Sequence, residues 1–366
     1  MDILLIIMAA FALLGLIDDL MNGKLGLAPK LNIGLASMGS LSIAYAGFYC
    51  IGTALIEQNA TAIANFTSGM PFDPSLIIGA LICSDSGGLP IALELARTGA
   101  LGVFTGSLIG SGLGLTIGFQ MPVFMSSLGK EHIPSFMQGM GYGIIALPVG
   151  LIVGGLTLGL SWKDLLLNTL PIAIICAVLV VAFRISLNKT VKVLTFIANI
   201  IRVITYIFFA LVIVGIFVPK WAIATPAKVE EVMYTVLRTT IVMSGGLVLS
   251  QIVTRYCKKP LAFATKLLKV NEASIIGLLI SSVSAVAMIP FFGQMDKRGK
   301  VMNAAFCVCG SFILGGQMAF NTSVLTSDAY AALVPETSVL AFMLNKIICG
   351  VLAIVIAGVL MKAEEE

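Results

Sequence analysis

Long apolar runs recur along the whole chain, and they restrict what it can fold into more than any other feature. Each run is near the ~20 residues that a helix needs to cross a bilayer. The runs cover residues 3–17, 33–56, 75–93, 99–128, 136–160, 166–183, 193–218, 232–254, 272–292, 301–322 and 339–361. Because 58% of the residues are hydrophobic and only 11% are charged, the chain lacks the polar surface of a soluble domain, in which about 25% of residues are charged. The sequence therefore predicts an all-α polytopic membrane protein.

Two of the runs are interrupted by residues that break helices. Residues 84–90 read Ser-Asp-Ser-Gly-Gly-Leu-Pro, and residues 281–290 contain three serines and a proline. Such interruptions are typical of re-entrant hairpins and broken helices in transporters. We expect about nine transmembrane helices plus two hairpins, at about 75–96 and 272–292, with eleven full spans as the alternative.

The distribution of basic residues favours the hairpins. If both interrupted runs return to the side they entered, the N-terminus lies outside and most basic residues outside the runs are cytoplasmic. The basic residues left on the outer side are Arg97, Lys163, Lys220 and Lys228. The positive-inside rule requires such an asymmetry, whereas eleven crossings would split the basic clusters at 255–269 and 296–300 between opposite faces. The excess of basic residues, a net charge of +4, therefore indicates the orientation of the chain in the membrane, and no nucleic-acid partner is expected.

A weak internal repeat relates the two interruptions. Matching glycine, serine, leucine, isoleucine and proline residues relate 79–86 to 277–284 at an offset of 198, and 90–111 to 290–311 at an offset of 200. The hairpins would then enter from opposite sides, which makes the halves inverted repeats, a common transporter plan. The expected division is residues 1–160 for repeat 1, 161–190 for a connector helix and 191–366 for repeat 2.

Asp85 is the one carboxylate deep within an apolar run. A charge at mid-bilayer costs about 2.5–3.5 kcal/mol on insertion scales, so a cation, a proton or a basic partner must offset it. Gly87 frees the backbone, and the half-helix before the break would direct its partly negative carbonyl end at the same place. Together with Ser84 and Ser86, these groups predict a site for a small cation.

The alternatives for Asp85 need no ligand. The carboxylate could pair with Arg238 or Lys346, or it could stay protonated. Both basic residues lie one to two turns inside span ends, where we expect their side chains to snorkel toward the membrane surface.

Polar residues of the second half could complete the site. Ser282 and Ser284 could bind a substrate hydroxyl, although small residues also serve helix packing. Asn303, Gln317 and Asn321 lie on the run 301–322 or next to it. Asn303 and Gln317 are 14 residues apart, about four turns of a continuous helix, so we expect them on one face.

No enzyme, cofactor or metal site is expected. The single histidine, His132, lies in a loop, and most of the seven cysteines lie within apolar runs. No phosphate-binding loop is present. An intramembrane enzyme would need a second catalytic group near Asp85, so it stays a remote alternative.

Several motifs are shared with a known family. The motifs are 296–306 (Asp-Lys-Arg-Gly-Lys-Val-Met-Asn-Ala-Ala-Phe), 85–88 (Asp-Ser-Gly-Gly), 92–96 (Ala-Leu-Glu-Leu-Ala), 148–150 (Pro-Val-Gly), 154–156 (Gly-Gly-Leu) and Arg255 with 259–261 (Lys-Pro-Leu). The sequence resembles the ethanolamine utilization permeases, EutH, along nearly its whole length. The resemblance implies a multi-pass protein of the bacterial inner membrane that takes up ethanolamine. In one departure, Gly316-Gln317 stands where the family pattern leads us to expect an Asp-His pair.

The residues and the resemblance together predict a transporter. Protonated ethanolamine would bind at mid-membrane between the two broken helices, with its ammonium on Asp85 and its hydroxyl on serines or amides of the second half, and alternating access would carry it across. An uncoupled facilitator or channel for ethanolamine or a related small amine is the main alternative. The expected partners are ethanolamine and membrane lipids, and the glycine- and aromatic-containing helix faces could support a homodimer.

Overall fold

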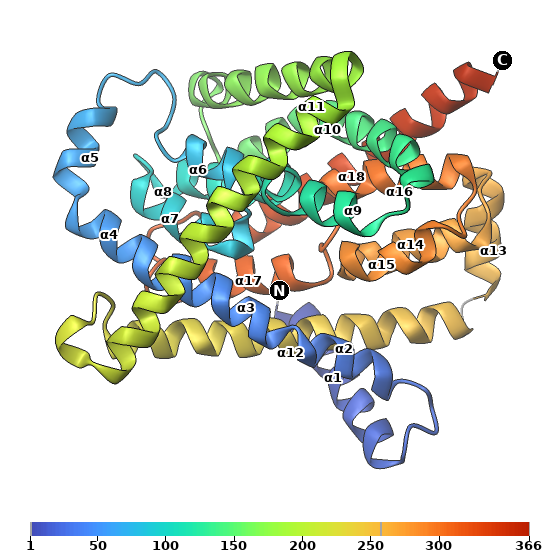
Figure 1. The fold of residues 1–366 in the computed structure, drawn as a ribbon, viewed down its shortest axis with the longest axis horizontal. Coiled ribbons are helices and arrows are strands. Elements are labelled where there is room, and N and C mark those ends of the chain that lie inside the picture. Colours follow the sequence, from blue (N-terminus) through green and yellow to red (C-terminus); the bar gives the residue numbers. More distant parts are fainter. Residues whose placement is uncertain (1, 257, 366) are drawn as a thin grey trace.

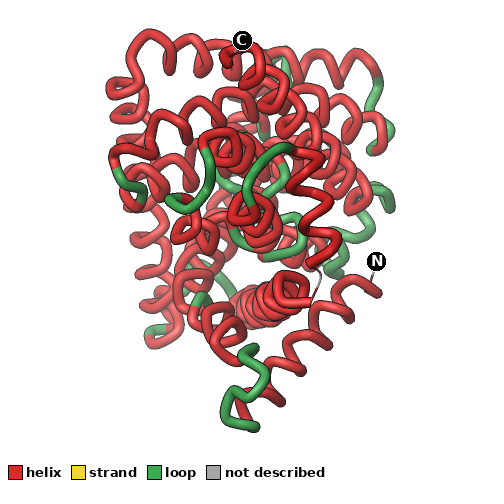
Figure 2. The backbone as a smooth tube through the Cα atoms, turned by 90° about the vertical axis from the view of Figure 1, so that its right-hand side faces the viewer, coloured by secondary structure: helices red, strands yellow, loops and turns green. Residues whose placement is uncertain are grey.

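The computed structural model describes residues 2–256 and 258–365, and every regular element within them is a helix (Figure 1, Figure 2). The first half contains α1 (Asp2–Leu20), α2 (Ala28–Ala36), α3 (Met38–Tyr45), η1 (Ala46–Gly52), α4 (Thr53–Gln58), α5 (Ala60–Thr67), α6 (Leu76–Leu81), η2 (Ser84–Ser86), α7 (Gly88–Leu95), α8 (Gly99–Gly102), η3 (Val103–Gly114), η4 (Thr116–Gln120), α9 (Met121–Ser127), η5 (Lys130–His132) and α10 (Ile133–Thr157). The second half contains α11 (Trp162–Phe217), η6 (Pro219–Trp221), α12 (Pro226–Tyr256), α13 (Lys258–Leu268), α14 (Glu272–Val283), α15 (Ala285–Phe292), α16 (Lys297–Cys309), α17 (Gly316–Leu325) and α18 (Ser338–Glu365). The all-α polytopic fold class is confirmed.

Seven helical stretches in the described residues are long and apolar enough to cross a membrane. They are Ala28–Gln58, Gly99–Met125, Lys130–Thr157, Trp162–Ser186, Asn188–Phe217, Pro226–Tyr256 and Ser338–Met361. Each coincides with one of the nine predicted spans. The other two predicted spans are α1 and the run 301–322, and the total number of crossings stays a prediction.

The connector helix and the next span form a single bent element, α11. Ser186 interrupts it with extended backbone angles (φ −157°, ψ 90°). Figure 1 shows the result as two rods, one along the top of the view and one crossing the front of the molecule diagonally. The bend lies between the runs 166–183 and 193–218, where the sequence predicts that one span ends and the next begins.

The first interrupted run is broken between α6 and α7, as the sequence predicts. Gly87 adopts a left-handed conformation (φ 96°), and a side chain there would also overlap Phe48. Both conditions require glycine at this position. The backbone of α6 packs directly on η3, because Gly79 faces the carbonyl of Thr105 and Gly114 faces the carbonyl of Ile82. The break is thus fixed against a fully buried helix.

The second interrupted run is also broken, between α14 and α15. Ser284 is extended (φ −153°, ψ 111°), and its hydroxyl accepts a bond from the Ala287 N–H at 3.4 Å. The two short helices lie side by side in Figure 1, as expected for a hairpin.

The run 301–322 is not the continuous span that the sequence predicts. It is broken between α16 and α17, where Phe312 has a positive φ of 60°. The N–H groups of Phe312 and Leu314 donate to the carbonyls of Ser281 and Ser282 at 3.1 and 2.8 Å. Since Gly315 lies against the Val283 carbonyl, the end of α14 and this segment hold each other in place.

A close contact between α1 and α12 supplies a stability test. Gly245 of α12 lies against the Met8 carbonyl of α1, where any Cβ would overlap the backbone. We expect Gly245→Ala to lower the free energy of unfolding by about 1–3 kcal/mol, because the two helices must separate. Thermal unfolding of the purified protein in detergent measures this effect.

The matched control is Gly141→Ala on α10, where an added Cβ meets nothing within 4 Å. That variant should unfold at or slightly above the wild-type temperature, because alanine favours a helix over glycine. Equal unfolding temperatures for the two variants would contradict the close packing of α1 on α12.

Candidate functional site

Asp85 lies in η2, inside the first break. The Cys83 thiol donates a hydrogen bond to Oδ1 of Asp85 at 2.7 Å. Among the described residues Asp85 forms no ion pair, so the pairings with Arg238 or Lys346 that the sequence left open are not formed. A carboxylate in this position still lacks a cationic partner.

The amino end of α17 lies next to this carboxylate. A Cβ placed on Gly316 would be 4.0 Å from Oδ2 of Asp85 and 3.8 Å from the Thr239 methyl group. The first N–H groups of a helix carry partial positive charge, which favours an anion there. The sequence predicts a partly negative carbonyl end at this place, and the structure adds a helix end of opposite sign.

Gln317 and Asn321 bring α17 into contact with the first break. Nε2 of Gln317 donates to Sγ of Cys83 at 3.1 Å, and Nδ2 of Asn321 donates to Oγ of Ser84 at 3.2 Å. The side-chain oxygens of Gln317 and Asn321 are buried and have no hydrogen-bond partner among the described residues. Buried polar atoms are normally satisfied, so these two oxygens are exceptions.

A cavity of about 570 Å³ unites the two predicted breaks. Asp85 and Ser86 line it from the first break, and Ser284 lines it from the second. Tyr45 and Gly316 also line it, and most of the remaining lining residues are apolar.

A second cavity of about 500 Å³ adjoins the first one. It is lined by Cys83 and by residues of α11, including Asn199 and Arg202. Ser86 lines both cavities, so the break between α6 and α7 borders each of them.

Two of the predicted site residues lie elsewhere. Ser282 donates its hydroxyl to the Leu279 carbonyl of its own helix at 2.6 Å. Nδ2 of Asn303 donates to the carbonyls of Ser274 and Gly299, both at 2.9 Å. Neither residue lines the cavity beside Asp85. The shared-face argument for Asn303 and Gln317 was wrong, because the helix between them is broken and its periodicity is lost.

Sequence reasoning did not select Tyr45, Cys83 or Thr239 for the site. Tyr45 packs on Phe320 of α17 with ring centroids 4.4 Å apart and lines the cavity. Only the position of Cys83, two residues before Asp85, could have signalled a role. Tyr45 and Thr239 lie in apolar runs without local features, so only the fold reveals their position.

Lys346 does not snorkel, contrary to the sequence-based expectation. Its side chain is fully buried, and Nζ donates to the carbonyls of Ser111 at 2.8 Å and Ser311 at 2.9 Å. These serines match each other in the predicted repeat, at an offset of 200. One ammonium group of α18 therefore bridges η3 and the segment after α16.

Comparison with known proteins decides the family. The family model described as "Ethanolamine utilisation protein, EutH" matches residues 1–360. The chain belongs to the EutH family. It is 28% identical to the probable ethanolamine permease EutH of Listeria monocytogenes, over 88% of this chain and 87% of the relative. No solved structure matches the chain.

Two further relatives extend the comparison. The probable ethanolamine permease EutH of Salmonella typhimurium is 25% identical over 100% of this chain and 96% of its own length. The uncharacterized protein YxeR of Bacillus subtilis is 27% identical over 91% of this chain and 90% of its own. The predicted resemblance is confirmed, and this EutH-family chain is an integral membrane permease.

The departure at Gly316-Gln317 has a visible structural result in this EutH-family chain. Gly316 begins α17 and has no side chain, so the helix end and Asp85 lie close together. Gln317 bonds to the break through Cys83. A neutral amide thus stands where a titratable histidine was expected.

The buried ammonium of Lys346 gives a prediction for this EutH-family chain. We expect Lys346→Met to lower the unfolding temperature, because the carbonyls of Ser111 and Ser311 each lose a charged hydrogen bond worth about 1.5–3 kcal/mol. Thermal unfolding in detergent is the measurement, and Lys163→Met, at an exposed position of α11, is the control. An unfolding temperature equal to that of the control would show that the bridge does not stabilise the fold.

Proposed function

We propose that this chain carries protonated ethanolamine across the inner membrane of a bacterium by alternating access, with Asp85 as the partner of the ammonium group. One observation carries the proposal. The carboxylate of Asp85 lies inside the helix bundle, lines a cavity and has no ion-pair partner among the described residues. Relatives named probable ethanolamine permeases support the choice of substrate.

The site suits the charged end of this substrate. Ethanolamine is a primary amine and is mainly an ammonium ion at neutral pH. An ammonium at Asp85 would supply the positive charge that a carboxylate needs in a low-dielectric interior. Because the thiol of Cys83 and the α17 amino end are weaker partners than a full charge, the carboxylate keeps affinity for a cation.

The hydroxyl of the substrate has several neutral partners within the same cavity. Ser86 and Ser284 line it from the two breaks, and Tyr45 lines it from α3. The buried acceptor oxygen of Gln317 lies on the adjoining helix α17. The site can therefore hold the two ends of an amino alcohol by different chemistry.

In this proposal the cavity would open toward the cytoplasm. Ile33 and Ser37 line it near the start of the span Ala28–Gln58, close to Lys30, which the charge distribution places on the cytoplasmic side. Toward the other end of this span, Phe320 contacts both Tyr45 and Tyr49, with ring centroids 4.4 and 6.4 Å apart. The geometry supports an inward-open state in which these rings close the outer side.

Movement of the two halves against each other would open the outer side. Both halves contribute a broken helix to the cavity, and inverted repeats with broken helices alternate in this way in other transporter folds. We assign 1–160 and 191–366 to the two repeats, with the bend of α11 between them. The homodimer that the sequence leaves open is not needed for this scheme, because one chain supplies every residue of the site.

Asp85→Asn tests the proposed role of the carboxylate. We expect it to abolish uptake of labelled ethanolamine at low concentration, because the neutral amide cannot balance the ammonium charge. Uptake by cells that express equal amounts of inserted protein is the measurement. Asp19→Asn, at an exposed position after the first apolar run, should transport normally. Normal uptake by the Asp85 variant would remove this residue from the mechanism.

Counterflow separates a carrier from a channel. Proteoliposomes loaded with unlabelled ethanolamine should transiently concentrate external labelled ethanolamine, because a carrier exchanges one substrate for another through an alternating site. A channel would let the label equilibrate without an overshoot. Absence of an overshoot, with rapid equilibration, would favour the uncoupled facilitator.

A further inference from the structure

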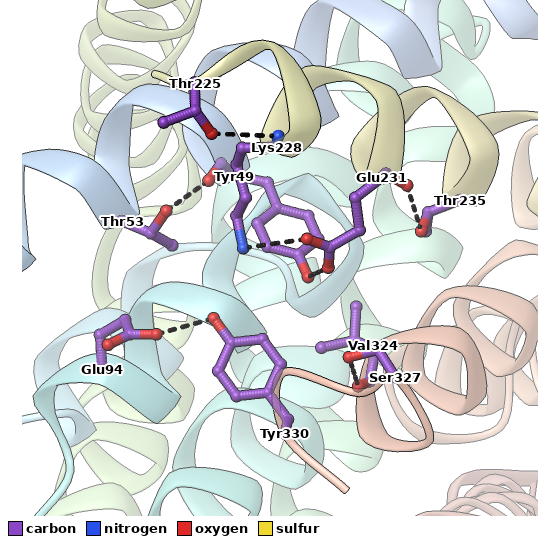
Figure 3. A network of polar contacts seen from close by, with 10 residues as sticks. All are labelled: Tyr49, Thr53, Glu94, Thr225, Lys228, Glu231, Thr235, Val324, Ser327 and Tyr330. Carbon is purple, nitrogen blue, oxygen red and sulfur yellow. Dashed lines mark hydrogen bonds and ion pairs between the residues drawn. The ribbon is translucent and has the colours of Figure 1, made fainter. Parts of the chain in front are cut away.

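A second group of charged and aromatic side chains surrounds an ammonium ion on the outer side of Phe320. Four elements supply it: Tyr49 from η1, Glu94 from α7, Lys228 and Glu231 from α12, and Tyr330 from the segment after α17 (Figure 3). We call these five residues the outer cage. They join the two halves of the chain, since Tyr49 and Glu94 belong to the first half and the others to the second.

The ammonium in the outer cage belongs to Lys228. Its Nζ lies 4.5 Å from the ring centroid of Tyr49 and 5.7 Å from that of Tyr330. Oε2 of Glu231 is 3.4 Å away. Ring faces and a carboxylate are the groups that recognise organic ammonium ions. Lys228 is thus a tethered primary amine that occupies a site built for this head group.

Hydrogen bonds orient both aromatic rings of the outer cage. The Tyr49 hydroxyl donates to Oε1 of Glu231, and the Tyr330 hydroxyl donates to Oε1 of Glu94, each at 2.8 Å. Burial, with nearby Tyr49 and Glu94, raises the pKa of Tyr330 well above its usual value, so its hydroxyl keeps the proton that it donates. Each ring is therefore fixed to a carboxylate of the opposite half.

The charges of the outer cage do not balance. The outer cage contains two carboxylates and one ammonium, and Glu94, which accepts the Tyr330 hydroxyl, forms no ion pair among the described residues. A further cavity of about 370 Å³ reaches Glu231 from the side of Arg238 and Asp328. Tyr49 and Tyr330 are buried, whereas the Lys228 side chain is 20% exposed, so the lysine can leave the cage more readily than the rings.

Contacts between aromatic rings link the outer cage to the cavity of Asp85. Tyr49 belongs to the cage, Phe320 contacts both Tyr49 and Tyr45, and Tyr45 lines the cavity of Asp85. A cation that leaves the cage inward would pass these rings and reach the carboxylate of Asp85. The same chemical group therefore meets a compatible partner at both ends of the path.

We propose that the outer cage is an entry site for small primary ammonium ions and that Lys228 closes it by occupying it. When the outer side opens, the Lys228 ammonium withdraws and the substrate ammonium replaces it between the two rings and the two carboxylates. The identity of the substrate rests on the proposed function, whereas the recognition of an ammonium ion rests on the cage alone.

Binding to the full-length protein in lipid nanodiscs tests this proposal. Asp85→Asn is the background variant, because it removes the inner carboxylate. Labelled ethanolamine and labelled methylammonium are the probes. We expect weak binding by Asp85→Asn alone, and binding at least about tenfold tighter after Lys228→Met is added, because the tethered competitor is gone.

Further changes identify the site that binds the probe. Adding Glu94→Gln and Glu231→Gln to the double variant should abolish binding. The control replaces Lys228→Met by Lys220→Met, a change at an exposed lysine in η6, and should bind no more tightly than Asp85→Asn alone. Neutral ethylene glycol should not compete. Each variant is first shown to unfold near the wild-type temperature. Tyr330→Leu in the double variant, which removes a ring and leaves Glu94 and Glu231 in place, gives a second route to weaker binding.

The outcomes separate this proposal from the transport function. Suppose that the wild-type protein binds ethanolamine, that loss of Lys228 does not tighten binding and that loss of Glu94 and Glu231 does not weaken it. This result overturns the cage and leaves the proposed transport function in place. Wild-type protein that binds no ethanolamine overturns the function. In that case the proposed cage would still be supported if the Lys228→Met variant bound methylammonium and this binding disappeared after Glu94 and Glu231 were replaced.

Discussion

Placing an acid inside an apolar helix bundle is the constraint on which the rest of this structure depends. Water cannot solvate Asp85 there as it would at a surface, and the structure supplies no basic partner among the described residues. What it supplies instead is a thiol donor, a helix amino end and a cavity. These groups make the carboxylate tolerable without neutralising it. The turn at Gly87 and the break before α17 bring these groups to one place.

The two halves meet this need with different backbone solutions. In the first half, the left-handed Gly87 turns the chain beside the acid, and the following span is an unbroken helix through η3 and η4. In the second half, the corresponding span is broken between α16 and α17, and the break delivers the amino end of α17 to Asp85. Lys346 then satisfies the carbonyls of Ser111 and Ser311, one from each half. The buried cation thus binds one carbonyl within η3 and one just after α16, whereas the carboxylate of Asp85 lies beside the amino end of α17.

The sequence predicts the fold class, the two breaks at residues 84–90 and 281–290, and Asp85 as a candidate site residue, because each has a local signal. A carboxylate beside two glycines and a proline stands out in an apolar run, and so does a cluster of serines. The break between α16 and α17 has no comparable signal. Its glycines resemble those of η3, which stay helical, and the break depends on contacts from distant parts of the chain, among them Ser281, Ser282 and Val283. The misplacement of Asn303 follows from this one error, because helical spacing says nothing across a break.

Asp85 and the outer cage solve the same problem at different depths. In the outer cage, where the Lys228 side chain is 20% exposed, an ammonium ion keeps part of its contact with water and binds to ring faces and a carboxylate. Deeper in the bundle, a carboxylate without an ion-pair partner has the stronger need for a cation. Affinity should therefore rise along the path from Tyr49 past Phe320 to Tyr45 and Asp85. A tethered ammonium that refills the cage behind the substrate would then close the outer side with the same interaction that first admitted the substrate.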